Sequence, residues 1–522
     1  MRLTTMLALL LSLLLAGKQL AVGPAQAADA RSTLTLVRGG DSITLDPARA
    51  NDSESTLVLD QICEGLVRMK DGSFQVEPAL AESWTISPDG LAWTFRIRRG
   101  VSFHDGSPMN AQAAATSIMR QVDPAHPFHA PGMYTAKSLF EHVAGCDALD
   151  ETTLRIRLNR PSASLLYSLA ASQAPILSPQ ALARWGADIR SHPVGTGPFM
   201  FVEWRRGESI TLVRNPDYWA GPPRLERLVV RTIPDAGARF LEFQTRRADA
   251  LTGIPPSDLT LLEKMPGVQL LRVAGLNIAY LGINTQRGPF RRAGVRRAVL
   301  LALDREALTR LVYGSSAFPA AALLPPALLD TGFVADPVRP KGDLTQARKL
   351  LAQEGLAGGM DAVLQVMDIP RPFLPEPRRM ALAIRQALAG VGIRVRIVTV
   401  PWADYLPQVA KGEHDLCLSG WTFDSPNPHE FLRYKLGWDS GGNVSLWRDE
   451  RFQALVNRAE ASRDEAERSG IFRQALRLIV AETPAVPLAH VRDTLALRDG
   501  VKGVILQPTG ATIRFAKAFR EP

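Results

Sequence analysis

An arginine and an aspartate stand where opposite charges could hold the two ends of one small ligand. Arg371 follows the apolar run that begins at Gln365, in a loop braced by two prolines. Asp424 follows a second apolar run, 415–419, at the end of the segment Gly420-Trp-Thr-Phe-Asp. A guanidinium holds a carboxylate through paired hydrogen bonds, and a carboxylate holds an ammonium equally well. A fixed cation and a fixed anion therefore suit a zwitterion such as a short peptide with free termini.

The elements around these residues indicate how the two charges are positioned. The β-branched run 393–400 predicts a strand, and the spacing of apolar residues over 402–411 predicts an amphipathic helix. Strands alternating with helices predict a parallel α/β sheet, whose ligands gather at the carboxyl ends of its strands. Because Arg371 and Asp424 each follow a predicted strand, we expect them at the same edge of the sheet.

The stretch from 371 to 424 also resembles a known family. It contains Arg371-Pro-Phe, Val391-Gly-Ile, Trp402-Ala-Asp-Tyr and Gly420-Trp, separated as in the periplasmic dipeptide-binding proteins of solute-binding family 5, the peptide/nickel class (cluster C) that serves ABC importers. Binders of the antimicrobial-peptide-transport type are close relatives and share the context Leu418-Ser-Gly-Trp. The likeness extends over nearly the whole chain after the leader.

The resemblance implies a fold and a division of labour. The fold is α/β, a bilobed periplasmic-binding-protein fold of type II with an extra inserted α+β subdomain. By analogy, Asp424 binds the peptide ammonium and Arg371 its carboxylate. Trp421, Thr422 and Phe423 line the neighbouring wall and offer backbone groups, with Gly420 in the same string. The expected function is capture of short peptides, dipeptides first, by hinge closure and delivery to an inner-membrane ABC permease.

Other ligands and other functions stay open. Where dipeptide binders carry a Gly-Asp-Pro-Asp-like sequence, this chain has Pro426-Asn-Pro-His and has lost both acids. Cationic antimicrobial peptides, haem and glutathione are therefore alternative ligands, whereas nickel is disfavoured because no histidine cluster stands out. A secreted peptide hydrolase and a periplasmic chaperone are alternatives of another class. No GxSxG or HExxH motif occurs, so we expect a protein that is not an enzyme and has no cofactor.

Composition favours an ordinary globular protein with more than one domain. The chain has 522 residues, of which 46% are hydrophobic and 22% charged. The formal net charge of +9 is spread over scattered arginines rather than a basic run, so we expect no nucleic-acid partner.

Residues 1–27 have the pattern of a signal peptide. Arg2 precedes an apolar segment from Met6 to Ala16, and Ala25-Gln-Ala27 fits a cleavage site. Position 18 is Lys18 rather than a lipid-carrying cysteine. No second membrane segment follows, so we expect a soluble protein of the periplasm without a lipid anchor. We also expect a monomer.

The three cysteines, Cys63, Cys146 and Cys417, match no zinc spacing. Cys63 and Cys417 lie in apolar patterns that indicate buried thiols, and a disulfide between any two of the three stays open.

The order of elements predicts three lobes. Lobe I comprises 28–70, 197–284 and 488–522, lobe II is an insertion at 71–196, and lobe III spans 285–487 with the ligand-binding loops. Asp89-Gly90 between alternating runs predicts a hairpin in lobe II. Gly195-Thr-Gly197 is interpreted as an interlobe turn rather than a phosphate loop, because Pro198 follows it. A helix is predicted over 293–312, and helical structure is predicted over 449–478.

Overall fold

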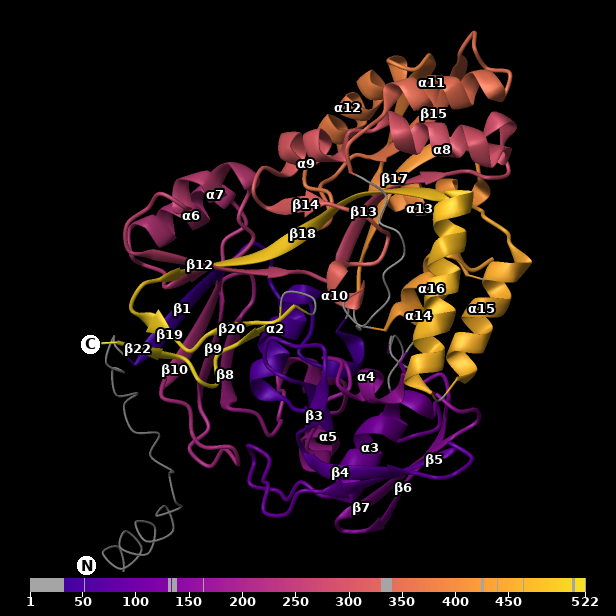
Figure 1. Cartoon of the computed structure of the whole chain (residues 1–522). Coiled ribbons are helices and arrows are strands. Elements are labelled where there is room, and N and C mark those ends of the chain that lie inside the picture. The colour runs from indigo at the N-terminus through magenta and orange to yellow at the C-terminus, as the bar shows by residue number, and fades with distance from the viewer. Residues whose placement is uncertain are drawn as a thin grey trace, which may run out of the picture.

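One 12-stranded sheet runs through lobes I and III and is carried from one to the other by a single strand, β18 (Ala485–Arg498). Figure 1 shows β18 as the long yellow arrow that joins the two regions. The structure is a computed structural model that describes residues 32–521 except 51, 130–132, 134–138, 163, 330–339, 424–426, 439, 463 and 509–511. The predicted signal peptide and Asp424 lie outside the described residues.

Lobe I is built around β1 (Thr33–Arg38), which lies between parallel β10 (Arg227–Thr232) and β11 (Ala250–Leu251). In β1 and β10 alternate residues are buried, so that one face packs on the lobe's core. The further elements of lobe I are α2 (Ser53–Ile62), β8 (Phe199–Arg205), β9 (Ser209–Arg214), α6 (Ala236–Gln244), α7 (Pro256–Leu262), β12 (Val268–Ala274), and the short strands β19 (Val501–Lys502), β20 (Ile505–Leu506), β21 (Ile513–Arg514) and β22 (Phe519–Arg520).

Lobe II contains a four-stranded antiparallel sheet in the order β4-β5-β7-β6. The predicted hairpin is confirmed, since β4 pairs with β5 and Gly90 in the turn has a φ of 73°. The elements of this lobe are β2 (Val67–Met69), β3 (Val76–Pro78), β4 (Ala81–Ile86), β5 (Ala92–Ile97), α3 (Ala111–Val122), β6 (Val143–Asp150), β7 (Thr153–Leu158), α4 (Leu165–Leu169) and α5 (Pro179–Trp185).

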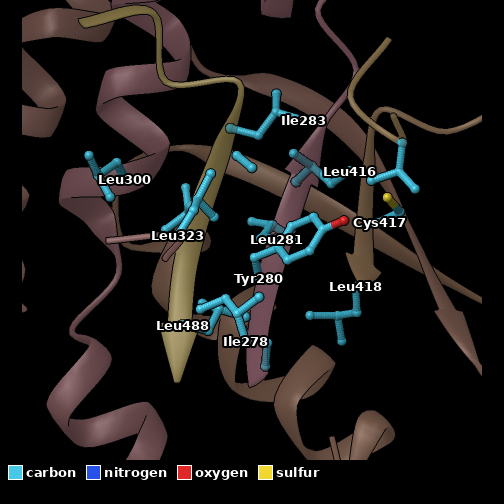
Figure 2. Close-up of a cluster of buried hydrophobic side chains, with 14 of the residues drawn as sticks. Ile278, Tyr280, Leu281, Ile283, Leu300, Leu323, Leu416, Cys417, Leu418 and Leu488 are labelled. Carbon is cyan, nitrogen blue, oxygen red and sulfur yellow. The ribbon is translucent and has the colours of Figure 1, made fainter. Parts of the chain in front are cut away.

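Lobe III is built around β13 (Asn277–Ile283), every residue of which is buried between β17 (Leu416–Thr422) and β18. Figure 2 shows Ile278, Leu281 and Ile283 of β13 with their side chains in the core of lobe III. The other elements of lobe III are α8 (Ala293–Ala302), α9 (Arg305–Tyr313), β14 (Ala317–Pro319), α10 (Pro326–Leu329), α11 (Leu344–Gln353), β15 (Met360–Met367), α12 (Pro377–Ala389), β16 (Ile393–Val400), α13 (Trp402–Lys411), α14 (Pro428–Leu436), α15 (Glu450–Ala461) and α16 (Glu465–Glu482).

The change of lobe along β18 falls between two consecutive residues. β18 pairs with β14 as far as Val491 and with β12 from Arg492 onward. Its first half contributes Val486 and Leu488 to the core of lobe III, and its second half contributes Leu495 to the core of lobe I. The other crossing lies between β12 and β13, next to the same point of β18. Two adjacent crossings are what a hinge between two bodies requires.

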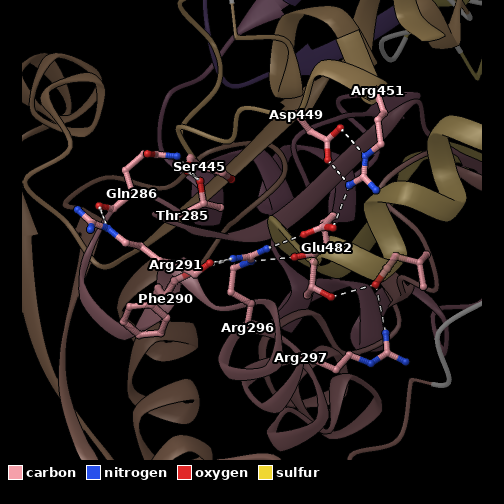
Figure 3. A network of polar contacts seen from close by, with 12 residues as sticks. Thr285, Gln286, Phe290, Arg291, Arg296, Arg297, Ser445, Asp449, Arg451 and Glu482 are labelled. Carbon is pink, nitrogen blue, oxygen red and sulfur yellow. Dashed lines mark hydrogen bonds and ion pairs between the residues drawn. The ribbon is translucent and has the colours of Figure 1, made fainter. Parts of the chain in front are cut away.

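A buried arginine fixes α8 to the end of α16. Arg296 is 3% exposed and donates to the carbonyl oxygens of Phe290, Arg291 and Glu482, at 2.9, 2.9 and 2.7 Å. Its Nη2 also lies 3.2 Å from Oε2 of Glu482, and the other oxygen of this carboxylate lies 3.2 Å from Arg451 (Figure 3). This network anchors the last turn of α16 just before β18 begins.

One sequence prediction needs correction. The helix predicted over 293–312 is two helices, α8 and α9, and the helical stretch predicted over 449–478 is likewise divided, into α15 and α16. The apolar spacing continues across both breaks, but Asp304 and Asp464 accept hydrogen bonds from the N–H groups of Ala307 and Glu467 and so start new helices.

The division into lobes stays a prediction of the sequence, and some of the described elements lie beyond its boundaries. β2 precedes the predicted start of lobe II at 71, but its Val67 packs in the core of that lobe. β13 precedes the predicted boundary at 284 but pairs with strands of lobe III. α5 lies within 71–196, yet its Ala181 and Leu182 pack in the core of lobe I.

None of the helices in the described part of the chain is long and apolar enough to cross a bilayer. The same residues contain no group of three or more metal-binding side chains. All three cysteines are buried as free thiols, and burial raises the pKa of Cys417 to about 12.

Candidate ligand-binding site

The two strands that precede the predicted charges are parallel neighbours. β15 pairs with β17 through Leu364 with Leu416 and Gln365 with Cys417. The loop of Arg371 follows β15, and Trp421 and Thr422 end β17. The carboxyl ends of both strands therefore lie at the same edge of the sheet, as the sequence predicts, and the segment that contains Asp424 begins there.

Arg371 is held in a closed loop with its guanidinium over an aromatic ring. The N–H of Arg371 donates to the carbonyl oxygen of Leu374 at 2.9 Å, and the N–H of Leu374 donates back at 2.8 Å. The guanidinium carbon lies 4.3 Å from the centre of the Trp402 ring. Burial lowers the pKa of Arg371, whose Nε is buried without a hydrogen-bond partner. Among the described residues no carboxylate lies within ion-pair distance of this guanidinium.

Gly420 supports the Arg371 loop from the neighbouring strand. A Cβ at position 420 would lie 2.1 Å from a ring carbon of Phe373 and 2.6 Å from the carbonyl oxygen of Ile278. The Phe373 ring therefore rests on the bare backbone of β17. Tyr313 also fixes Phe373, because the Tyr313 hydroxyl donates a hydrogen bond to the Phe373 carbonyl oxygen at 2.9 Å.

The next three residues of the string have different environments. Trp421 is partly buried, with its ring 4.9 Å from that of Tyr434, and Thr422 pairs with Asn277 at the end of β17. Phe423 is 2% exposed and stacks on Phe431 at 4.8 Å. Its N–H donates to the carbonyl oxygen of Leu276 at 2.7 Å, so the sheet fixes the backbone just before Asp424.

A cavity of about 380 Å³ lies between lobe II and lobe III beside this string. Trp421 and Phe423 line it, whereas Arg371 does not. The remaining lining residues are, from lobe II, Leu139, Glu141, His142, Val143, Ser162, Ser164, Leu165 and Gln173 and, from lobe III, His429, Glu430, Arg433, Tyr434, Ser440, Gly441 and Glu460.

Ion pairs cross from one lobe to the other around the cavity. On α15, Glu460 lies 3.0 Å from Arg160 and 3.4 Å from His142 of lobe II. These partners, with the hydrogen bond from His142 first, lower the pKa of Glu460 to about 2. A second pair of opposite polarity joins Arg433 of α14 to Glu141 at 3.8 Å.

Lys435 lies behind the aromatic wall of the cavity. It is 7% exposed, and its Nζ lies 4.2 Å from the centre of the Trp421 ring and 4.9 Å from that of Tyr434. Burial lowers its pKa to about 7. Sequence reasoning missed this lysine and the lobe II residues of the cavity, since no local pattern marks contacts between segments so far apart.

Comparison with known proteins identifies the family. Residues 75–443 match the model of the bacterial extracellular solute-binding proteins, family 5. The chain belongs to this family. The family 5 chain is 34% identical to the heme-binding protein A of Haemophilus influenzae over 86% of its own length and 85% of that protein. It is 31% identical to the dipeptide-binding protein of Escherichia coli, covering 85% of this chain and 86% of that one.

Solved structures of similar proteins agree with the fold. The structure of HbpA2 from Haemophilus parasuis superposes with a TM-score of 0.87 at 31% identity, covering 94% of this chain and all of that one. The periplasmic binding protein DppA of Helicobacter pylori, in complex with the peptide STSA, gives 0.77 at 31% identity, with coverage of 94% and 98%. The predicted fold, a bilobed type II periplasmic-binding-protein fold, is confirmed.

Proposed function

We propose that this family 5 protein captures short peptides, dipeptides first, in the periplasm and delivers them to an inner-membrane ABC permease. The observation that carries the proposal is Arg371, a half-buried cation at the ligand edge of the sheet without an ionic partner among the described residues. A desolvated guanidinium gains most from a carboxylate that arrives with the ligand.

Asp424 is the proposed partner of the ammonium group at the other end of the peptide. Phe423, the residue before it, is held by the hydrogen bond to Leu276, so the segment starts from a fixed point. An aspartate there would pair with the peptide ammonium. The separation of the two charges would then select peptides by length, and closure of the lobes about the crossings at β12–β13 and β18 would exclude water from both pairs.

The relatives support a peptide as ligand. The Escherichia coli relative is named a dipeptide-binding protein, and the Helicobacter pylori structure contains a peptide. As a solute-binding protein this chain would release its ligand chemically unchanged. That behaviour separates it from the hydrolase alternative, which would yield amino acids, and from a chaperone, which would bind unfolded chains whatever their termini.

The test is calorimetric titration of dipeptides into protein that has been unfolded and refolded to remove retained ligand. Arg371→Gln and Asp424→Asn are each expected to weaken binding about 10-fold to 100-fold, the effect of losing a charge-assisted hydrogen bond. The exposed Arg378→Gln on α12 is the matched control and should bind as the wild type does. A folded wild type that binds no dipeptide, or an Arg371→Gln variant of unchanged affinity, would refute the two-ended clamp.

A second candidate ligand is haem, and His429 in the cavity favours it. The imidazole is 8% exposed, its Nε2 lies 3.7 Å from the Glu460 carboxylate without a hydrogen bond, and burial lowers its pKa to about 4. A neutral imidazole in an aromatic-lined cavity is a suitable ligand for iron. The Haemophilus influenzae relative is named a heme-binding protein.

Titration with haem, followed by its absorbance, separates the two ligands. Stoichiometric binding that His429→Ala weakens at least tenfold would support haem. Spectra that do not change with added protein would remove it as a candidate.

A further inference from the structure

The cavity between lobes II and III is a distinct region of the site, because its lining includes Trp421 and Phe423 but not Arg371. It begins at the side chains that immediately precede Asp424 in the chain. A peptide held by its termini would thus have this cavity beside its ammonium end. What the cavity offers to such a ligand depends on which of its lining groups are already engaged.

Most of the charged groups at the cavity are engaged with one another across the lobes, and Glu430 has an interaction of its own. Glu460 contacts both Arg160 and His142, and Arg433 pairs with Glu141. Each pair joins one residue of lobe II to one of lobe III. A charged ligand group would have to displace a partner that is already in place, so these charges favour no ionic ligand.

The apolar part of the lining comes from both lobes and lies among the polar side chains of Ser162, Ser164, Gln173 and Ser440. Lobe II contributes Leu139, Val143 and Leu165, and lobe III contributes Trp421 and Phe423. Lys435 lies behind the Trp421 ring and helps to fix its position through a cation–π contact. A volume of about 380 Å³ is at the lower end of ligand pockets, which suits large side chains rather than a long peptide.

We propose that this cavity binds a large apolar or aromatic side chain of the peptide, so that lobe II takes part directly in ligand selection. The proposal rests on the proposed function and adds a substrate class to it, namely peptides that carry such a side chain. The pairs of Glu460 with Arg160 and of Arg433 with Glu141 hold the wall from lobe II against the wall from lobe III. They act as positioning residues.

The test compares dipeptides that differ in one side chain. Ala-Ala, Ala-Phe, Phe-Ala, Ala-Trp, Trp-Ala, Ala-Lys and Ala-Asp are titrated into the refolded protein. At least one Phe or Trp dipeptide is expected to bind about 10-fold to 100-fold more tightly than Ala-Ala, the gain from burying a large side chain. The Lys and Asp dipeptides should show no comparable gain.

Two variants locate the preference. Gln173→Trp, which introduces a ring from lobe II into the cavity, should bring the ratio of aromatic to alanine affinities close to one. Glu460→Gln should lower this ratio several-fold by releasing the lobe II wall. The matched control Glu450→Gln removes the same charge from an exposed position on the same helix and should leave both affinities unchanged. Thermal unfolding verifies that each variant is folded.

The outcomes distinguish this proposal from the proposed function. Dipeptide binding without an aromatic or apolar preference, a preference for charged side chains, or a ratio unchanged in Gln173→Trp would overturn the cavity assignment alone. A folded wild type that binds none of the dipeptides would overturn the proposed function as well.

Discussion

The side-chain amide of Asn277 forms hydrogen bonds with both the carbonyl oxygen and the N–H of Val491. Its Nδ2 donates to the Val491 carbonyl at 2.9 Å, and its Oδ1 accepts from the Val491 N–H at 2.7 Å. Asn277 begins β13, and Val491 is the last residue of β18 that pairs with lobe III. One side chain therefore joins the two segments on which lobe I and lobe III would turn.

Asn277→Ala is expected to loosen this hinge. Loss of the amide leaves the Val491 N–H without its partner and should lower the free energy of unfolding by ~1–3 kcal/mol. It should also change the balance of open and closed forms, which X-ray scattering with and without ligand measures. Asn457→Ala, at an exposed position of α15, is the control. Unchanged stability and unchanged scattering curves would contradict this role of Asn277.

Gly420→Ala is expected to displace the Arg371 loop. The added methyl group would collide with the Phe373 ring and with the carbonyl oxygen of Ile278. Overpacking of this kind costs ~1–3 kcal/mol, and the shifted loop should also weaken dipeptide binding. Gly358→Ala, where a Cβ meets nothing within 4 Å, is the matched control for urea unfolding and calorimetry. Equal behaviour of the two variants would show that the contact of Phe373 with Gly420 is unimportant.

Arg296→Met is expected to destabilise lobe III without touching the site. The change removes the donors for three carbonyl oxygens and the contact with Glu482, so we expect a loss of ~2–3 kcal/mol in urea unfolding. The exposed Arg291→Met, which loses one hydrogen bond to the carbonyl oxygen of Gln286, should cost much less. Similar losses in both variants would mean that the Arg296 network adds little.

Lys435→Met is expected to stabilise the protein near neutral pH. The folded-state pKa of about 7 lies below the ordinary value of 10.5, so the unfolded chain binds more protons between these values. Stability from this group therefore rises with pH across that window, and the neutral variant should lose this dependence. Near pH 7 the free energy of unfolding of Lys435→Met should exceed that of the wild type by ~1–3 kcal/mol. Unfolding of both proteins at pH 7.5 and again at pH 9.5 measures this difference. A parallel pH dependence in both proteins would contradict it.

Acid is expected to destabilise the protein through two histidines that are shielded from water, His104 partly and His490 fully. Burial lowers the pKa values of His104 and His490 to about 4, from an ordinary value of 6.5. Their contribution to stability is present above pH 6.5 and is lost as the pH falls towards 4. His104→Gln and His490→Asn place an amide nitrogen near the ring nitrogen that contacts Gly197 or Asn277 and should flatten the decline. Urea unfolding from pH 7 to 4.5 is the measurement, and slopes equal to that of the wild type would disprove it.

The elements of lobe III show what local pattern can predict. The strand 393–400 and the helix 402–411 have the same bounds in the structure as in the prediction. The β-branched pattern of the strand and the helical spacing of the helix are each clear, and Pro401 separates the two elements. The predicted edge for Arg371 also follows from local pattern, because adjacent parallel strands bring their ends together. At Asp304 and Asp464 the apolar spacing concealed the start of a second helix.

The cavity between the lobes could not be predicted in this way. The pair of Arg160 and Glu460 joins residues 300 positions apart, and neither lies in a distinctive motif. Lys435 likewise looks like one more basic residue at the end of a helix, and only its burial behind Trp421 sets it apart. The partnership of Arg371 with Asp424 in binding one ligand stays a prediction.

The position of β18 in the chain has a consequence for how the protein acquires its structure. Residues 485–498 complete the sheets of both lobe I and lobe III, yet almost the whole chain precedes them in synthesis. β11 and β12 of lobe I and β13 and β14 of lobe III all lack their common neighbour until then. Neither lobe can complete its sheet before residues 485–498 are in place, so both acquire their final structure late and together.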